Sequence, residues 1–248
     1  MFMEPGKIPS CSSMSINQEF NPVWFPSPNY SQRRDNLKQP RLIVIHYTAM
    51  ATSELALERL CSPIHQVSCH YLITEKGKIY QLVEDEMRAW HAGAGSWMGQ
   101  SDINSRSLGI ELANFGNHPY SLPQIFSLET TLRHLINKWD MPIHNIIGHS
   151  DMAVGRKLDP GRKFDWRGLA LSNLSIWSDC EISGTVDKSE FITLAESFGY
   201  SSPKDKSEED SLCLLLDSFR SRFRPWASGE LNEHDIGCLR ELVSISEC

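Results

Sequence analysis

The chain has 248 residues, of which 40% are hydrophobic and 22% are charged, a composition typical of a globular protein with one sizeable core or a medium core plus a small second domain. Its formal net charge of −7 at pH 7 argues against nucleic acid or an anionic membrane as the main partner. A basic stretch at 156–167 is a local exception. It could attract an anionic substrate, although a solvated basic loop is the simpler interpretation.

Cysteine usage and the lack of long apolar runs bear on location. The seven cysteines are odd in number and show neither metal-like nor disulfide spacing, which predicts free thiols in a reducing compartment. No apolar run approaches the ~20 residues of a membrane helix, so we expect no membrane span. Residues 1–15 lack the apolar core of a secretory signal. These features favour the cytoplasm, with the periplasm as the alternative.

The first third of the chain predicts an extended segment followed by strands. Residues 1–39 are polar and interrupted by prolines, so we expect an extended N-terminal segment packed on the core. The leucine spacing of 53–60 predicts a helix capped by Ser53. Gly77 lies where a hairpin turn needs a positive φ. Runs rich in β-branched and aromatic residues predict strands at 41–47, 70–74 and 79–83.

Strands continue to alternate with helices through the middle of the chain. We expect a core strand at 107–112, a helix at 127–139 from its leucine spacing, and a short strand at 145–148. This alternation predicts an α/β domain over 40–180, with a mixed central β-sheet flanked by helices.

The character of the sequence changes after Trp177. A small-residue stretch at 182–185 is interpreted as a linker. Three amphipathic patterns then predict a small helical bundle over 186–248, adequate in size when it is docked on a larger domain. The predicted helices cover 187–198, 208–223 and 232–244.

Two histidines and an aspartate follow predicted strands or precede a turn. His46 ends the strand at 41–47, His149 follows the strand at 145–148, and Asp159 precedes Pro160 and Gly161. A lone histidine at a strand end is more often structural than a ligand. Together, however, two imidazoles and one carboxylate match a catalytic zinc site with one open position. Asp159 also suits a turn, and the two roles are compatible.

Two further charged residues are candidates for catalysis. Lys157 lies two residues before Asp159, so an extended chain places both side chains on the same side. Glu111 lies in an apolar strand, where burial of a charge is costly without a partner. It could act as a general base on an activated water, or it could pair with Arg106. Trp90 and His91 precede small residues and either line a cleft or form a packed turn.

Five segments, taken in order along the chain, resemble the zinc-dependent N-acetylmuramoyl-L-alanine amidases of type 2. That family includes AmpD and AmiD, phage amidase lysozymes and peptidoglycan recognition proteins. The resemblance covers about residues 20–180. Its segments are RLIVIH at 41–46, SCHYLI at 68–73, AWHAG at 89–93, LGIE at 108–111, and 148–161 with its KLDPG end.

The resemblance implies a role for each candidate residue. The implied zinc ligands are His46, His149 and Asp159. Glu111 corresponds to the catalytic acidic residue and Lys157 to the cation that stabilises the oxyanion. The implied substrate-binding residues are His91, Asn114 and Arg156, the last through peptide carboxylates. An aspartate as third ligand resembles the AmpD and AmiD branch. Cys69 departs from relatives that carry a tyrosine there, so it is assigned no chemistry.

The expected activity is hydrolysis of the amide bond between the lactyl group of N-acetylmuramic acid, or its anhydro form, and L-alanine. Zinc is the expected cofactor, peptidoglycan fragments or muropeptides are the expected partners, and the chain is expected to be a monomer. A peptidoglycan recognition module that does not cut is the alternative, and a structural zinc or thiol protein is disfavoured by the absence of Cys-x-x-Cys pairs. Phe191, Gly199–Tyr200 and the run FRSRFRP at 219–225 resemble the small helical C-terminal domain of AmiD-type enzymes, which belongs to the peptidoglycan-binding class. A packing domain is equally open.

Overall fold

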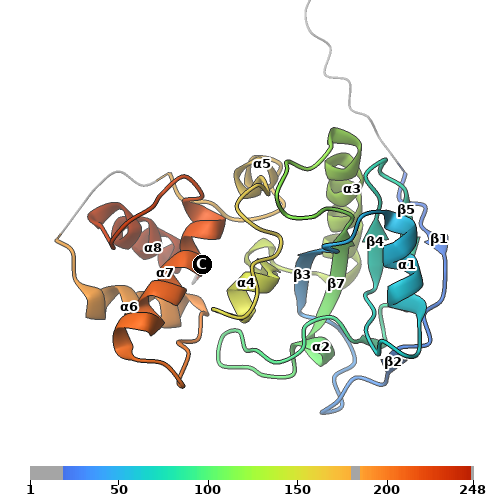
Figure 1. Ribbon diagram of the computed structural model, residues 1–248, viewed down its shortest axis with the longest axis horizontal. Helices are drawn as coiled ribbons and strands as arrows, with labels where there is room; N and C mark the ends of the chain where they lie inside the picture. The colour runs from blue at the N-terminus through green and yellow to red at the C-terminus, as the bar shows by residue number, and fades with distance from the viewer. Residues whose placement is uncertain (1–18, 180–184, 247–248) are drawn as a thin grey trace, which may run out of the picture.

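A computed structural model of the chain describes residues 19–179 and 185–246 (Figure 1). Its centre is a six-stranded mixed sheet in the order β1-β5-β4-β7-β3-β8. Strands β4, β7, β3 and β8 run parallel to one another, and β5 forms an antiparallel pair with β4. The strands of this sheet are β1 (Val23–Trp24), β3 (Leu42–Tyr47), β4 (Tyr71–Ile73), β5 (Ile79–Gln81), β7 (Ser107–Leu112) and β8 (Ile146–Gly148). The mixed sheet predicted from the sequence is therefore confirmed.

Side chains of the central strands alternate between the two faces of the sheet, as the two-residue period of a strand requires. On one face, Ile43 and Ile45 pack in a cluster with α3 (Leu122–Trp139) and α5 (Trp166–Leu171). On the other face, Leu42 and Val44 belong to a cluster that extends to the C-terminal helices. A third cluster packs α1 (Ser53–Cys61) against β4 and the chain after β5. Helices thus cover both faces.

The C-terminal helices share a hydrophobic core with the sheet. These helices are α6 (Lys188–Phe198), α7 (Glu208–Phe223) and α8 (Glu233–Ser246), close to the predicted ranges. Figure 1 shows them gathered at one end of the molecule, with the short helix α4 (His149–Met152) between them and β3. Phe191, Phe219 and Phe223 lie in the same buried cluster as Val44 and Ile147 of the sheet. Most of the linker predicted at 182–185 lies outside the described residues.

The described part of the N-terminal segment lies against the sheet edge. Strand β1 runs parallel to β5, and β2 (Tyr30–Ser31) pairs with β6 (Arg88–Ala89) in a second, two-stranded sheet. Arg33 is buried and donates hydrogen bonds to the carbonyl oxygens of Ser105, Ser107 and Asp85. None of the helices in the two described ranges is long and apolar enough to cross a membrane.

Two helix starts differ from the sequence prediction. Thr52, not Ser53, caps α1, because its side chain accepts a hydrogen bond from the Leu55 N–H. Helix α3 begins at Leu122 rather than at 127: Ser121 accepts from the Gln124 N–H, and Pro123 occupies the first turn, where its missing N–H costs no hydrogen bond. The predicted hairpin is confirmed, with Gly77 at a φ of +79°. The short helix α2 (Ile103–Arg106) was not predicted.

Candidate active site

The candidate site lies at the carboxyl ends of three neighbouring parallel strands. His46 near the end of β3 is the register partner of Glu111 in β7. Strand β8, on the other side of β3, ends at Gly148, and His149 follows as the first residue of α4. Because parallel strands end at the same edge of a sheet, residues more than a hundred positions apart meet there.

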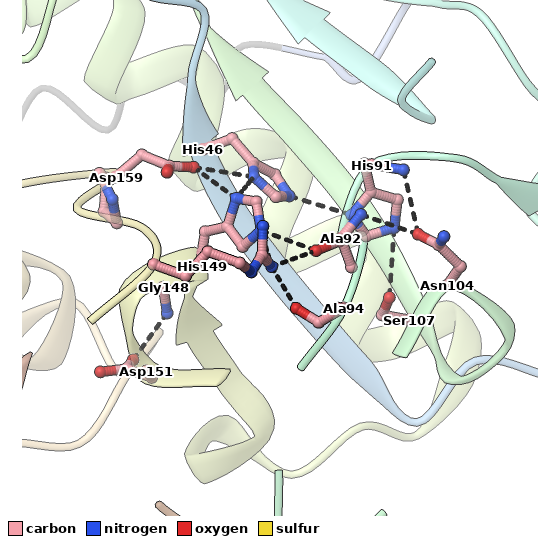
Figure 2. Close-up of polar contacts among 12 residues, drawn as sticks. His46, His91, Ala92, Ala94, Asn104, Ser107, Gly148, His149, Asp151 and Asp159 are labelled. Carbon is pink, nitrogen blue, oxygen red and sulfur yellow. Dashed lines mark hydrogen bonds and ion pairs between the residues drawn. The ribbon is translucent and has the colours of Figure 1, made fainter. Parts of the chain in front are cut away.

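His46, His149 and Asp159 form the only group of three or more potential metal ligands found within residues 19–179 and 185–246. His46 Nδ1, His149 Nδ1 and Asp159 Oδ2 are each 2.9 Å from one another (Figure 2). Burial, followed by the neighbouring His149, lowers the pKa of His46 to about 4, which keeps this imidazole neutral. Burial opposes ionisation of Asp159, yet its contacts with His149 and His46 hold its pKa below the usual range. A neutral imidazole and an ionised carboxylate are the protonation states that a divalent ion requires of such ligands.

Hydrogen bonds to the ring nitrogens of His46 and His91 determine which of these nitrogens carry a hydrogen. The Ser107 hydroxyl donates to the Ile103 carbonyl at 2.6 Å, so it accepts from His91 Nε2 at 3.2 Å. His91 Nδ1 then carries no hydrogen and accepts from His46 Nε2 at 3.0 Å. This chain of hydrogen bonds leaves the lone pair of His46 Nδ1 facing His149 Nδ1 and Asp159 Oδ2. These three atoms are called the ligand triangle below. Gly109 makes room for the His91 ring, because a Cβ at this position would lie 2.5 Å from His91 Cγ.

His149 is oriented in the same way by a backbone carbonyl. Its Nε2 donates to the Ala92 oxygen at 2.9 Å, which leaves Nδ1 without a hydrogen and facing Asp159. Arg156 donates to the same Ala92 oxygen and to the Ala94 oxygen, so its guanidinium holds the loop that orients His149. The Ser150 N–H donates to the Asp159 carbonyl at 2.9 Å, which links the two ligand-bearing segments.

Glu111 lies beside the triangle in a cavity of about 460 Å³. Its Oε2 atom is buried and has no hydrogen-bond partner among the residues that the structure describes. Burial, and then the charge of Asp159, raises the pKa of Glu111 to about 8, while Lys157 opposes this increase. Arg106, the alternative partner considered from the sequence, instead lies near Asp35 at 3.6 Å. The cavity therefore contains a carboxyl group with a raised pKa and a free hydrogen-bonding position, as is common for a general acid or base.

A family model described as N-acetylmuramoyl-L-alanine amidase matches residues 36–162. The chain belongs to this amidase family. AmiD of Escherichia coli strain K12 is 30% identical over 223 residues, covering 79% of each chain. The 1,6-anhydro-N-acetylmuramyl-L-alanine amidase AmpD of Citrobacter freundii is 33% identical over 158 residues, covering 57% of this chain and 84% of its own length.

Solved amidase structures agree with the fold. The structure of E. coli AmiD in complex with the substrate anhydro-N-acetylmuramic acid-L-Ala-D-γ-Glu-L-Lys has a TM-score of 0.76 at 27% identity and covers 88% of this chain and 98% of that one. AmpDH3 of Pseudomonas aeruginosa has a TM-score of 0.78 at 26% identity and covers 90% of this chain and 99% of that one. These two structural matches cover 88% and 90% of the chain, so they extend beyond residues 20–180, the range of the resemblance found in the sequence.

Seven of the eight residues singled out from the amidase resemblance line the cavity, whereas Asn114 does not, and the contacts of Arg156 and Asn114 differ from those expected. Lys157 lines the cavity with Glu111 and the ligand triangle. Arg156 also lines it, but its guanidinium is engaged by loop carbonyls rather than free for a peptide carboxylate. Asn114 is buried and organises the loop at 114–118: it accepts from the Gly116 N–H and contacts His118. It is not among the described residues that line the cavity.

Several cavity residues were not singled out from the sequence. Ser68 and Arg59 of α1 are two of them, whereas Trp90 also lines the cavity and agrees with the cleft interpretation given from the sequence. Ser107 does not line the cavity but orients His91 through a hydrogen bond. A signal for Ser107 and His91 was present in Gly109, a glycine inside a core strand, which often marks the close approach of another group. Nothing in the local sequence around Arg59 indicates a cavity wall. Cys69 is buried, and burial followed by Glu111 raises its thiol pKa, consistent with its assignment to no chemistry.

Proposed function

We propose that the chain is a zinc-dependent amidase that cleaves the bond between the lactyl group of N-acetylmuramic acid, or its anhydro form, and L-alanine during peptidoglycan turnover and recycling. The observation that carries the proposal is the placement of His46, His149 and Asp159 beside Glu111 and Lys157 in one cavity. A recognition module that only binds has no need of a partnerless carboxyl group next to a complete ligand triangle. Family membership and the names of the relatives support the choice of substrate.

The donor set fits zinc. Two imidazole nitrogens and one carboxylate oxygen are ligands typical of catalytic zinc sites, and the 2.9 Å separations allow one ion to reach all three at the ~2.0–2.2 Å that zinc prefers. When bound, zinc supplies Lewis acidity, which polarises a carbonyl oxygen and makes water a better nucleophile at neutral pH.

The protein side chains account for the proton transfers. The ionised form of Glu111 accepts a proton from the water that attacks the lactyl carbonyl carbon. Lys157 stabilises the negative charge that develops on the carbonyl oxygen. When the C–N bond breaks, Glu111 returns the proton to the leaving nitrogen of L-alanine. The products are a lactyl carboxylate on the sugar and a stem peptide with a free amino terminus.

Product analysis tests the proposed function. Mass spectrometry should detect free stem peptide from anhydro-muropeptide, and a chelator should stop its release until zinc is restored. Parallel digestion of purified sacculi tells whether the polymer is also a substrate. Binding to muropeptide without release of stem peptide would instead support the recognition module.

Lys157→Met should lower turnover by ~10²–10³-fold, because an oxyanion stabiliser is worth about 2.7–4 kcal/mol in the transition state. Lys157 is not one of the three potential metal ligands, so its removal should leave the zinc content unchanged. Lys163→Met, at an exposed position six residues further on, is the control. Wild-type turnover by Lys157→Met would rule out this role.

His91→Ala should weaken zinc affinity by ~10–100-fold, the usual effect of losing a group that orients a metal-binding imidazole. The reason is that His46 loses the acceptor for its Nε2 hydrogen. Competition with a chromogenic chelator measures the affinity, and exposed His65→Ala is the matched control. Unchanged affinity in His91→Ala would contradict the hydrogen-bond chain and return His91 to the substrate-contact role predicted from the resemblance.

The remaining sequence predictions extend this proposal. The names of the AmpD relatives favour anhydro-muropeptides as substrate. A cytoplasmic location, a monomeric state and the division into segments 1–39, 40–180 and 186–248 stay predictions.

A further inference from the structure

A fully buried carboxylate lies two residues after the metal-ligand candidate His149. Asp151 of α4 has an exposed fraction of 0%. Its Oδ2 accepts a hydrogen bond from the Gly148 N–H at 2.7 Å and another from Arg222 Nη1 at 2.9 Å. Its Oδ1 accepts from the Tyr200 hydroxyl at 2.9 Å. Only the first of these partners comes from its own turn, which Figure 2 shows beside the triangle. The other two come from the C-terminal helical region.

Arg222 of α7 reaches both ends of the segment that carries His149. Its side chain is 1% exposed. Besides the bond to Asp151, its Nη2 donates to the Ile146 carbonyl at 2.9 Å, at the first residue of β8. Its guanidinium also lies over the Trp166 ring, 4.5 Å from the centroid. The bonds to Ile146 and Asp151 therefore bracket His149 on the chain.

The same segment also holds the third ligand, because the Ser150 N–H donates to the Asp159 carbonyl. A movement of 146–151 would shift His149 directly and Asp159 through this bond. Ligand positions in a zinc site have a tolerance of only about 0.2 Å, so a small shift is sufficient to weaken binding.

We propose that Arg222 and Tyr200 are positioning residues for the metal site, so that the C-terminal helices support the ligand triangle and are not merely a module joined to the amidase core. The proposal rests on the proposed function in one respect, namely that zinc occupies the triangle. These helices then have a structural role in the site whether or not they also bind glycan.

Arg220 provides a matched control on the same helix. It is 3% exposed and pairs with Asp235, which is fully buried, at 2.5 Å. This pair stays within the C-terminal helices, because Asp235 lies in α8 and the other partners of Arg220 are the Gly229 and Glu230 carbonyls. Each aspartate keeps two other partners if its arginine is removed: Asp151 keeps Gly148 and Tyr200, and Asp235 keeps Arg224 and Asn232.

The experiment compares Arg222→Met, Arg222→Lys and Arg220→Met in the full chain. Zinc affinity is measured by competition with a chromogenic chelator, and the Tm of each metal-free protein is measured separately. Both methionine variants should lower the Tm, because each removes an arginine that pairs with a buried aspartate. Only Arg222→Met should weaken zinc binding, by ~10–100-fold, and Arg222→Lys should recover part of that loss.

Tyr200→Phe serves as a second probe if Arg222→Met does not fold, because it removes one hydroxyl from Asp151 and keeps the ring. It should weaken zinc binding in the same direction by a smaller factor. Equal zinc affinities for Arg222→Met and Arg220→Met, or for Tyr200→Phe and wild type when only that variant folds, would overturn the inference and leave the proposed function intact. A wild-type protein that binds zinc but releases no stem peptide would overturn the function and leave the inference standing.

Discussion

Glu111→Gln should lose most hydrolytic activity, by ~10²–10⁴-fold in kcat, while zinc affinity stays close to that of wild type. Glutamine keeps the size of the side chain but cannot accept and return a proton. The loss therefore isolates the proton-transfer role from any effect on packing. Glu111 is not part of the ligand triangle, and within the described part of the chain its Oε2 atom has no hydrogen bond that the substitution would break. The measurement is single-turnover release of stem peptide together with the zinc content of the purified variant.

Glu58→Gln is the control for this change, because Glu58 is exposed on α1. It should have wild-type kinetics. If Glu111→Gln kept wild-type turnover, another group would have to move the proton, and the raised pKa of Glu111 would have no catalytic meaning. If it lost zinc instead, Glu111 would belong to the metal site.

Asp159→Ala should lose both zinc binding and activity, the largest combined effect expected for a single substitution in this chain. Asp159 supplies the only negative charge of the triangle and touches both imidazoles at 2.9 Å. Its removal leaves only the two imidazoles as ligands, so zinc affinity should decrease by more than the ~10–100-fold expected for the loss of a residue that only orients a ligand. A ligand that binds only the folded state raises the Tm. Zinc should therefore raise the Tm of wild type and have no such effect on Asp159→Ala.

Exposed Asp205→Ala is the matched control and should retain the full thermal response to zinc. An Asp159→Ala protein that still binds zinc with wild-type affinity would show that the triangle is not the metal site. In that case the close approach of the three side chains would have to be explained as a buried hydrogen-bonded network.

Much of the central fold could be predicted because its signals are local. The β-branched run of β3 and the long amphipathic pattern of α7 need no distant information. The two-residue strands β1, β2 and β6 carry no such signal, because they exist only through pairing with partners far away in the sequence. The start of α3 was missed because its first turn contains a proline and an exposed leucine rather than the apolar spacing used to find the helix.

The proximity of His46, His149 and Asp159 was predictable because these residues end strands or begin a turn, and because the amidase motifs occur in order. The supporting contacts were not. Ala92 contributes a backbone carbonyl, which has no sequence signature. Arg222 lies in a helix with many charged residues, and nothing local distinguishes an arginine that is buried against α4 from one in solvent. Such partners depend on tertiary packing between segments about seventy residues apart.

His46 in β3 and Glu111 in β7 are register partners, so under the proposed function turnover depends on the correct alignment of these two strands. A slip of one residue between these strands would move one of the two side chains to the opposite face, since strand side chains alternate. Molecules with this one-residue slip would bury a similar apolar surface but would not hydrolyse the substrate. Recovery of hydrolysis after refolding therefore counts the correctly aligned molecules, a population that far-UV circular dichroism alone does not distinguish.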